Sequence, residues 1–294
     1  MTQFKGQTRS HMLRFPNAKI NLGLNVTGVR SDGFHDIETV IFPIPLCDAM
    51  EVVPSVDNQV DFQHSGLFIP GNYEENLCYL AYQLLKKEFD LPAVKMCLHK
   101  IIPMGAGLGG GSSDAAFTIK MLNELFSLEL SQTQMIQFAR SLGSDCAFFI
   151  ENTPVFANGR GDQFEPIDLT LSGYSVVIVV PPVHVSTAEA YQHVDTKKPG
   201  ENIKAILKDP PGEWKNRLLN DFERTVFQTY PEIMKIKEHL YDAGAIYASM
   251  SGSGSAVFGL FNQLLPNMDS FKQCMVWTGK PETIKKPCDC RAQG

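Results

Sequence analysis

The 294-residue sequence has no long apolar run and no long cluster of lysine and arginine. No segment approaches the roughly 18 consecutive apolar residues that a membrane-spanning helix needs. A net charge of −6 without a basic cluster argues against a nucleic-acid-binding face, so an anionic ligand would have to be held by a local site. The hydrophobic and charged fractions, 44% and 20%, are those of an ordinary globular protein.

Paired cysteines are also missing. The seven cysteines are scattered and form no C-x-x-C pair, and two of them lie in a polar segment, 281–294, that we expect to be a tail. We recognise no signal peptide and expect a reducing cytoplasm as the location. Residues 1–11 show no apolar periodicity, and His11-Met12 resembles a cloning junction. We therefore expect 1–11 to be a tag or disordered.

The strongest positive signal is a run with five glycines in seven positions, Gly105 to Gly111, between a strand-like apolar segment and an amphipathic helix expected over 113–126. Residues without a Cβ let backbone N–H groups approach a ligand closely. A helix N-terminus adds unsatisfied N–H groups and the positive end of the helix dipole. This combination predicts an anion site for phosphates. A flexible linker is the alternative, although linkers are rarely framed by a strand and a helix.

Three kinds of phosphate loop can be compared with this run. A Walker A loop is excluded because Gly111 stands where its lysine is required. The dinucleotide pattern G-x-G-x-x-G is matched by Gly105, Gly107 and Gly110. It also needs an acid at the end of a second strand about 20 residues later. A helix over 132–142 is expected there instead, which disfavours a nicotinamide oxidoreductase.

The third kind is a glycine loop followed by hydroxyls and an early acid, here Ser112, Ser113 and Asp114. Either serine could contact phosphate or ligate Mg²⁺, and no other metal ligand is indicated. Capping of the helix would explain both serines equally well.

The pattern along the chain predicts a mixture of hairpins and helices, and hence an α+β fold. Strict alternation over 18–26 predicts a half-buried strand. Its polar face would carry Lys19, Asn21, Gly23 and Asn25, with Gly23 leaving room for a ligand. A turn is expected at 30–33. Further strands are expected at 37–42, 50–53, 175–180, 245–250 and 256–261, and further helices at 76–89 and 231–243.

Three segments resemble the GHMP small-molecule kinases, in that family's order. The central motif is Pro103-Met-Gly-Ala-Gly-Leu-Gly-Gly-Gly-Ser-Ser-Asp-Ala-Ala116, flanked by Asn17-Ala-Lys-Ile-Asn-Leu22 and Ser249-Met-Ser-Gly-Ser-Gly-Ser-Ala256. The resemblance implies a ribosomal-S5-like N-terminal domain (12–165) and a ferredoxin-like C-terminal domain (166–280), with the site between them. It also implies ATP and Mg²⁺ as cofactors. The phosphate contacts would be Gly105, Gly107, Gly109, Gly110, Gly111, Ser112 and Ser113.

Two residues are candidates for catalysis. Asp145 precedes an apolar run, and a carboxylate hemmed in by apolar residues should have a perturbed pKa that suits a base. It could equally be the N-cap of a short helix. Lys19 taken alone is more easily explained as a solvated side chain. In the family, however, Gly143-Ser-Asp145 matches the segment that supplies the catalytic aspartate, and the matching lysine pairs with it and polarises the substrate hydroxyl.

One sequence element indicates which alcohol accepts the phosphoryl group. Arg30-Ser-Asp-Gly-Phe-His35 resembles an element of the family's cytidyl branch, which phosphorylates the 2-hydroxyl of 4-diphosphocytidyl-2-C-methylerythritol in non-mevalonate isoprenoid synthesis. Phe34, where Tyr is usual, would stack on cytosine, and His35 would bind the ring edge. The other implied contacts with this substrate are Asn21, Thr187, Tyr191, Ser251 and Gly252, and those with adenosine are Asn76 and Lys100.

The alternatives left open are a homoserine or mevalonate kinase of the same family and a catalytically silent nucleotide-binding protein. The loop 249–255 could also be a simple glycine-permitted hairpin. A small-molecule substrate is the expected partner, with neither nucleic acid nor membrane. The sequence leaves monomer and homodimer open.

Overall fold

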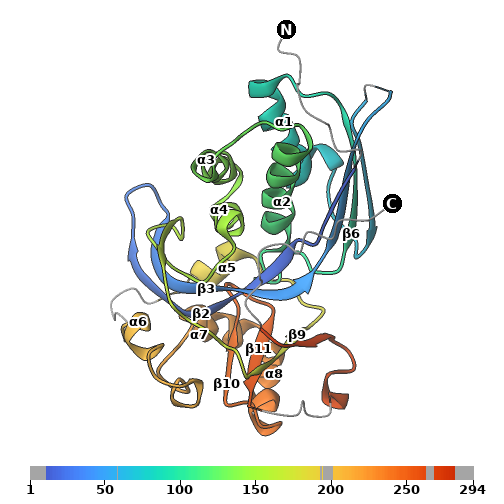
Figure 1. Cartoon of the computed structure of the whole chain (residues 1–294). Helices are drawn as coiled ribbons and strands as arrows, with labels where there is room; N and C mark the ends of the chain where they lie inside the picture. Colours follow the sequence, from blue (N-terminus) through green and yellow to red (C-terminus); the bar gives the residue numbers. More distant parts are fainter. Residues whose placement is uncertain (1–10, 58, 193, 195–200, 263–267, 282–294) are drawn as a thin grey trace.

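The structure is a computed structural model that describes residues 11–281 except 58, 193, 195–200 and 263–267. The expected tag therefore lies outside the described residues apart from His11, as does the expected tail apart from Pro281. Three four-stranded sheets and a set of helices are arranged in an upper and a lower part, with β2 and β3 crossing between them (Figure 1). None of the described helices is long and apolar enough to cross a membrane.

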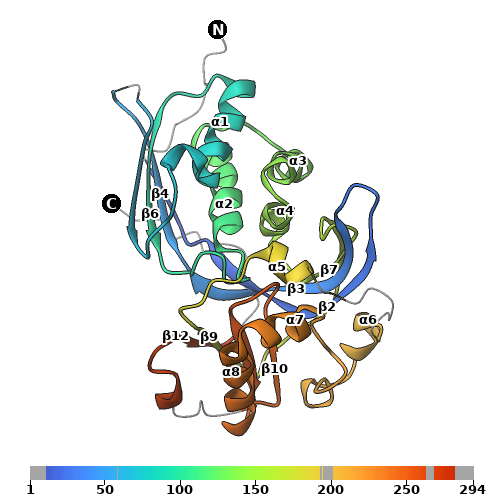
Figure 2. The ribbon, with the colours of Figure 1, turned by 180° about the vertical axis from the view of Figure 1, so that it is seen from behind.

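The upper part contains one sheet and four helices. The sheet has the order β1-β4-β6-β5, and β5 runs parallel to β6 at its edge. One apolar cluster joins this sheet to the helices, which lie together on one side of it in both views (Figures 1 and 2). The elements are β1 (Met12–Arg14), β4 (Ala49–Pro54), β5 (Asp61–Gly66), α1 (Leu77–Phe89), β6 (Val94–Lys100), α2 (Gly110–Leu125), α3 (Gln132–Leu142) and α4 (Ser144–Glu151).

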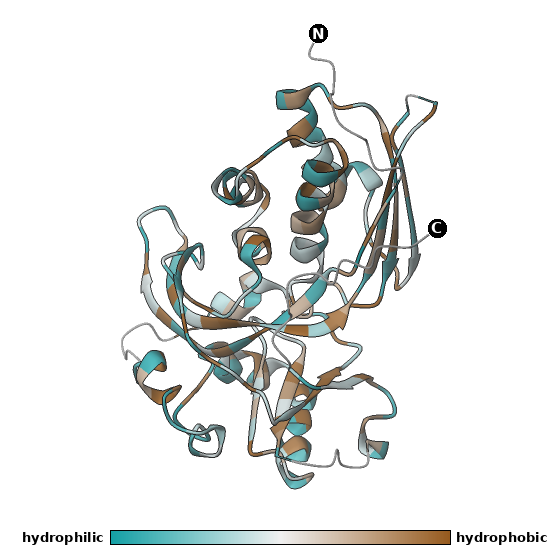
Figure 3. Cartoon of the chain, in the orientation of Figure 1, coloured by the Kyte–Doolittle hydropathy of each residue, from teal (hydrophilic) through white to brown (hydrophobic). Residues whose placement is uncertain are grey.

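The crossing sheet has the order β2-β3-β7-β8, and all of its pairs are antiparallel. Figure 3 shows mostly apolar segments where its long strands cross the molecule and a polar hairpin tip at their end. The tip contains the predicted turn, closed by the Gly33 N–H donating to the Arg30 carbonyl at 3.1 Å. The strands are β2 (Asn17–Val29), β3 (His35–Cys47), β7 (Val155–Asn158) and β8 (Gln163–Pro166).

The lower part is built on the antiparallel sheet β10-β11-β9-β12. Its strands and helices are β9 (Ser175–Val180), α5 (Thr187–Tyr191), α6 (Ile203–Ile206), α7 (Phe222–Thr229), α8 (Pro231–Asp242), β10 (Tyr247–Met250), β11 (Val257–Phe261) and β12 (Met275–Gly279). Short 3₁₀ turns lie at Tyr73–Glu75, Pro211–Glu213 and Asp269–Phe271. The expected hairpin across 251–256 is present, with Met250 paired to Val257.

The prediction that β2 is half-buried is wrong. Ten successive residues from Asn17 to Val26 are buried. Ala18, Ile20 and Leu22 pack in a core shared with β9 and β11. The opposite face is also covered, because Lys19 lies against Gly109 of the glycine run and Asn21 lies against Gly252. A strand between two packed layers is buried on both sides, whatever the polarity of its residues.

The alternation along β2 is also interrupted, at Gly23. Asn21 pairs with Ile41 and Leu24 pairs with Thr39, so Gly23 is an extra residue at a β-bulge. Because Thr39 and Ile41 face the same side of β3, Leu24 shares the face of Asn21, and Asn25 lies on the opposite one. Gly23 leaves no room for a ligand either: a Cβ there would lie 2.6 Å from Leu218 Cδ1. The expectation that Asn25 shares the face of Lys19 is therefore wrong, and so is the expectation that Gly23 leaves room for a ligand.

The remaining predicted elements are present, with small differences at their ends except for the strand predicted at 37–42, which extends as β3 over His35–Cys47. Helix α3 and strand β9 have the predicted bounds, and Asn76 caps α1 by accepting the N–H of Cys78 at 2.9 Å. Helices α2, α3 and α4 follow one another without a strand across the fully described stretch 110–151, as the argument against a dinucleotide fold requires. The predicted domain boundary at 165/166 falls within β8 and stays a prediction.

Candidate functional site

The glycine run forms a loop and the first turn of α2. Gly105, Gly107 and Gly109 have φ of +64°, +77° and +71°, values that favour glycine. Gly109 is the N-cap of α2, and Gly110 and Gly111 belong to the helix. The first N–H groups of a helix have no intrahelical acceptor, so this turn presents donors and the positive end of the dipole. The geometry suits an anion.

Close packing explains why position 107 is glycine. A Cβ there would lie 1.9 Å from the Ser251 carbonyl oxygen, in the serine-glycine loop between β10 and β11. The two loops are joined by the Ser251 Oγ donating to the Gly107 carbonyl at 2.8 Å and by the Ala256 N–H donating to the Ala106 carbonyl at 3.0 Å. The serine-glycine loop therefore faces the glycine loop.

We expect Gly107→Ala to lower the free energy of unfolding by about 2–4 kcal/mol, through the clash with Ser251 and the positive φ. Gly173→Ala is the matched control, because φ is +90° there and a Cβ would meet nothing within 4 Å. That control carries the backbone strain without the clash and should cost about 1–2 kcal/mol. Urea unfolding measures both, and equal losses would contradict the packing argument.

Lys19 and Asp145 lie together beside the glycine loop. Lys19 Nζ is 3.6 Å from Asp145 Oδ2, and a Cβ at Gly109 would lie 3.1 Å from Lys19 Cγ. Asp145 is in the first turn of α4, whose N-terminus favours a negative charge. The two residues come from segments more than 100 positions apart, so chain proximity does not account for the pair.

A chain of hydrogen bonds holds the lysine. Lys19 Nζ donates to Asn21 Oδ1 at 2.6 Å, Asn21 Nδ2 donates to Thr39 Oγ1 at 3.0 Å, and Thr39 Oγ1 donates to the Gly23 carbonyl at 2.5 Å. All three side chains are buried. The bulge at Gly23 thus provides the last acceptor of the chain, and the ammonium group is fixed in place.

Two expectations for Asp145 are wrong. Its side chain is 39% exposed rather than hemmed in by apolar residues, because the apolar run that follows it turns into the core as α4. It is not the N-cap either: Gly143 holds that position, and Asp145 makes no capping bond. The carboxylate is open to a ligand on one side and faces an ammonium group on the other.

Two buried residues of the segment 220–223 hold the serine-glycine loop. Asn220 Nδ2 donates to the carbonyls of Met250 and Gly252, at 2.9 and 2.8 Å. Glu223 Oε1 accepts from Ser249 Oγ and the Met250 N–H, at 3.0 and 2.8 Å. Gly252 in turn lies against Asn21, since a Cβ there would be 3.4 Å from Asn21 Oδ1. The serine-glycine loop is therefore fixed next to Asn21, which accepts the hydrogen bond from Lys19.

The aromatic residues of the expected substrate site form two groups. His35 stacks on Tyr191, with centroids 4.4 Å apart and planes at 22°, and Tyr191 meets Phe222 edge-on. Burial raises the pKa of the Tyr191 phenol, and the charge of Asp145 raises it further. Phe34 is 51% exposed and carries the Arg160 guanidinium 3.7 Å above its ring. His35 and Tyr191 cannot both face a base placed between them, because they contact each other.

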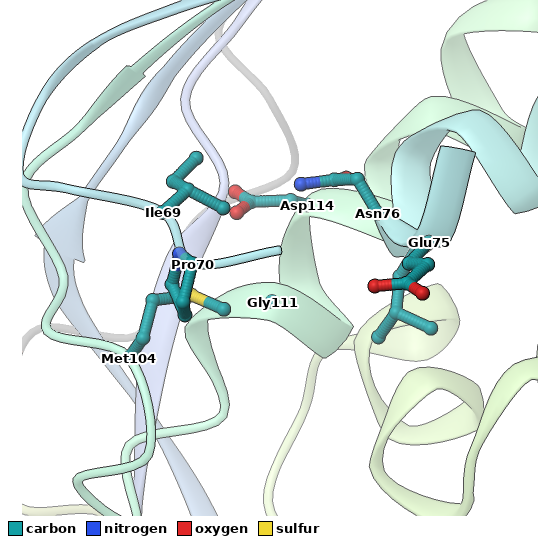
Figure 4. A pocket seen from close by; sticks show the side chains of 8 residues that line it. Ile69, Pro70, Glu75, Asn76, Met104, Gly111 and Asp114 are labelled. Atoms are coloured by element: carbon teal, nitrogen blue, oxygen red, sulfur yellow. The ribbon is translucent and has the colours of Figure 1, made fainter. Parts of the chain in front are cut away.

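A pocket lies on the other side of the first turn of α2. Its walls are mostly apolar, and Asn76 and Asp114 point toward each other across it (Figure 4). Lys100, expected at the adenosine, does not line it. The Lys100 side chain is fully buried between Asp48 and Asp114, at 2.5 and 2.8 Å, so it lies behind the pocket as a counter-ion. The full lining is Ile69, Pro70, Glu75, Asn76, Leu77, Met104, Gly111 and Asp114.

The two serines differ in their surroundings, and neither caps α2, which begins two residues before them. Ser113 is completely buried, and its Oγ has no hydrogen-bond partner among the described residues. Ser112 is partly exposed in the first turn. No group of three or more His, Cys, Asp or Glu side chains in the described ranges is arranged to hold a metal ion.

Comparisons with known proteins agree with this geometry. The family described as GHMP kinases N terminal domain matches residues 76–153, and GHMP kinases C terminal matches residues 202–267. A 4-diphosphocytidyl-2-C-methyl-D-erythritol kinase from Bacteroides fragilis is 54% identical over 253 residues, covering 85% of this chain and 92% of the relative.

The chain belongs to the GHMP kinase family.

Two further likenesses are to enzymes of the same name. The relative from Parabacteroides distasonis is 48% identical over 271 residues, covering 92% of this chain and 99% of the relative. A crystal structure of 4-(cytidine 5'-diphospho)-2C-methyl-D-erythritol kinase aligns with a TM-score of 0.72 at 33% identity, covering 85% of this chain and 90% of that one. The expected α+β GHMP kinase fold is confirmed.

In this GHMP kinase, residues expected from four separate segments meet in one place: Lys19 and Asn21 on β2, Gly109 at α2, Asp145 on α4 and Gly252 in the serine-glycine loop. Thr187 joins them through its Oγ1, 3.2 Å from Ser253 Oγ. Sequence reasoning missed several supporting residues. Most of them are polar side chains that become buried only in the fold, which a single sequence does not reveal: Thr39, Asp48, Asn220 and Glu223. It also missed two exposed ones, Arg160 and His184, the latter against Gly105.

Proposed function

We propose that the protein transfers the γ-phosphoryl group of ATP to the 2-hydroxyl of 4-diphosphocytidyl-2-C-methyl-D-erythritol, in non-mevalonate isoprenoid precursor synthesis. The observation that carries the proposal is the Lys19–Asp145 pair, 3.6 Å apart, directly beside a glycine loop at a helix N-terminus. A phosphate site and a carboxylate held next to a cation are what phosphoryl transfer to an alcohol requires. The substrate is that in the names of relatives about half identical to this chain.

In the proposed reaction, Asp145 accepts the proton of the 2-hydroxyl while that oxygen forms a bond to the γ-phosphorus. The bond from the γ-phosphorus to the bridging oxygen of ATP breaks, and ADP leaves. The 2-hydroxyl is a tertiary alcohol, so the nucleophile is hindered and gains from removal of its proton. Lys19 orients the carboxylate and offsets negative charge as it develops near the loop.

The donors of the loop and first helical turn are proposed to hold the phosphates: Gly105, Gly107, Gly109, Gly110, Gly111 and Ser112. Ser113 is not included among these donors, because its side chain is completely buried. The residues present suit Mg²⁺: the Ser112 hydroxyl is an oxygen donor at the loop, and phosphates and water complete a hard-ligand set. When bound, the ion neutralises charge on the transferred phosphoryl group.

Phe34 is proposed to stack on the cytosine of the acceptor, and His35, fixed by Tyr191, to contact the edge of the ring. We expect Phe34→Ala to raise KM for the cytidyl substrate by about 5- to 150-fold, the equivalent of roughly 1–3 kcal/mol of base stacking. Its kcat should change little, because the ring is not at the reacting atoms. Phe15→Ala, which removes another exposed phenylalanine, is the control. An unchanged KM in the Phe34 variant would remove this residue from the substrate site.

The test of the function is ADP release with Mg-ATP and each of three alcohols: the cytidyl substrate, homoserine and mevalonate. Turnover on the cytidyl substrate alone is expected. Turnover on homoserine or mevalonate would still support a kinase but would contradict the proposed contacts of Phe34 and His35 with cytosine. If ATP binds without turnover on any of them, a silent nucleotide-binding protein becomes the better description.

The setting is proposed to be the cytoplasm, where thiols stay reduced. In the described part of the chain the cysteines are free, which supports this location: Cys47, Cys78, Cys97, Cys146 and Cys274. The proposed partners are the nucleotide and the small-molecule acceptor, without nucleic acid or membrane. Either a monomer or a homodimer is compatible with the proposal.

A further inference from the structure

Asp114 has one carboxylate oxygen that accepts no hydrogen bond from the described part of the chain. The residue is 2% exposed and lies in α2, on the pocket beside the first helical turn. Its Oδ2 accepts a hydrogen bond from Lys100 Nζ at 2.8 Å. Its Oδ1 is buried and has no hydrogen-bond partner among the described residues. A buried acceptor without a donor costs free energy comparable to a lost hydrogen bond, so a ligand donor is the natural complement.

The carboxylate cannot easily turn to satisfy that oxygen internally. Lys100 is held from its other side by Asp48 Oδ2, and Asp48 Oδ1 accepts the N–H groups of Ile101 and Ile102 at 2.5 and 2.8 Å. This network fixes the ammonium group and hence the oxygen of Asp114 that it contacts. A role as the counter-ion of Lys100 therefore accounts for Oδ2 and not for Oδ1, and Figure 4 shows the carboxylate directed into the pocket.

Asn76 supplies the opposite polarity across the same pocket. Its Oδ1 caps α1 by accepting the Cys78 N–H at 2.9 Å, so its amide NH₂ is left for a ligand. Figure 4 shows the Asn76 amide nitrogen and the Asp114 carboxylate directed at each other, with Ile69, Pro70 and Met104 along the walls. Where they face each other, Asn76 and Asp114 offer one donor and one acceptor, with apolar side chains beside them, an arrangement expected for a flat heteroaromatic ring.

We propose that Asp114 reads the exocyclic amine of the adenine base. A 6-aminopurine carries an N–H donor next to a ring-nitrogen acceptor, which matches Asp114 Oδ1 beside the Asn76 amide. The inference rests on the proposed function, since it takes the pocket to hold the base of ATP. It makes Asp114 a specificity-determining residue and gives Lys100 a positioning role.

The test compares ATP with purine riboside 5'-triphosphate, which lacks only the 6-amino group. Binding is measured by calorimetry at pH 8 with Mg²⁺, because burial raises the pKa of Asp114 to about 7 and the carboxylate is ionised above it. Wild-type protein should bind the analogue about 10- to 100-fold more weakly, the range for a hydrogen bond to a charged group. Equal affinity would overturn the proposal, whatever happens in any variant.

Asp114→Asn completes the comparison. Lys100 needs an oxygen partner, so the amide NH₂ would face the pocket and oppose the amine of ATP. We expect ATP affinity to fall to the level of the analogue, and the analogue's own affinity to stay within about 3-fold. Asp168→Asn, the same change at an exposed carboxylate outside the pocket, should keep the wild-type difference. Retention of that difference in a folded Asp114→Asn protein would contradict the proposal. Absence of ATP binding to wild-type protein would instead contradict the proposed function.

Discussion

Replacing Asp145 by asparagine should lower kcat by about 10²–10⁴-fold, the range for loss of a general base. Asparagine keeps the shape of the side chain but cannot accept the proton of the 2-hydroxyl. The side chain is 39% exposed and makes no capping bond, so the fold should tolerate the change. The Kd for ATP should change by less than about 3-fold, because the amides of the loop remain. Steady-state kinetics and nucleotide calorimetry measure the two quantities.

Glu151→Gln provides the matched control for that variant. Glu151 lies at the opposite end of α4, and its carboxylate is bonded to Gln132 at 2.6 Å rather than facing Lys19. Its kcat should stay near the wild-type value. An Asp145→Asn protein with full kcat would show that the carboxylate is not the base, even though it lies beside the lysine.

Lys19→Met should lower kcat by about 10²–10³-fold, the range for removal of one electrostatic donor at a reacting centre. The change removes the charge and keeps most of the apolar stem. It leaves Asp145 without its cation and Asn21 Oδ1 without its 2.6 Å donor in a buried site. The loss should be larger in kcat than in KM for either substrate. Thermal unfolding is measured in parallel to check that the strand is intact.

The pair should also act as a unit. In the double variant with Asp145→Asn, the loss of kcat should be clearly smaller than the product of the two single losses, because each residue works through the other. Independent, multiplicative losses in well-folded proteins would contradict the coupling that the 3.6 Å separation indicates.

The parts of the site that follow from local sequence were predictable. A glycine run between a strand and a helix specifies its own backbone, and β9 and α3 are bounded by clear turn and cap signals: Ser131, for example, forms a full capping box with Gln134. The position of Lys19 on a strand face also follows from alternation, and the bulge two residues beyond Asn21 does not disturb it.

What could not be predicted depends on contacts between distant segments. The missing side chain of Gly23 suggests space for a ligand when only the sequence is known. The structure shows that the Leu218 side chain occupies that space. Lys100 is close to the glycine loop in the sequence. Its ammonium group is nevertheless buried in the interior, where it forms an ion pair with Asp48. The exposure of Asp145 depends on how α4 meets β2. A β-bulge and a buried ion pair arise from tertiary structure. Neither the hydrophobic periodicity nor the capping residues of the local sequence indicate them.

The most direct test of the proposed reaction is ³¹P NMR of the product that the wild-type enzyme makes from Mg-ATP and 4-diphosphocytidyl-2-C-methyl-D-erythritol. The acceptor carbon of the 2-hydroxyl carries no hydrogen, so a phosphate placed there should give a monoester signal without three-bond coupling to a proton. We predict that uncoupled signal, appearing together with ADP. A doublet or triplet would place the phosphate on another hydroxyl and contradict the proposed reaction, as would ATP that stays intact.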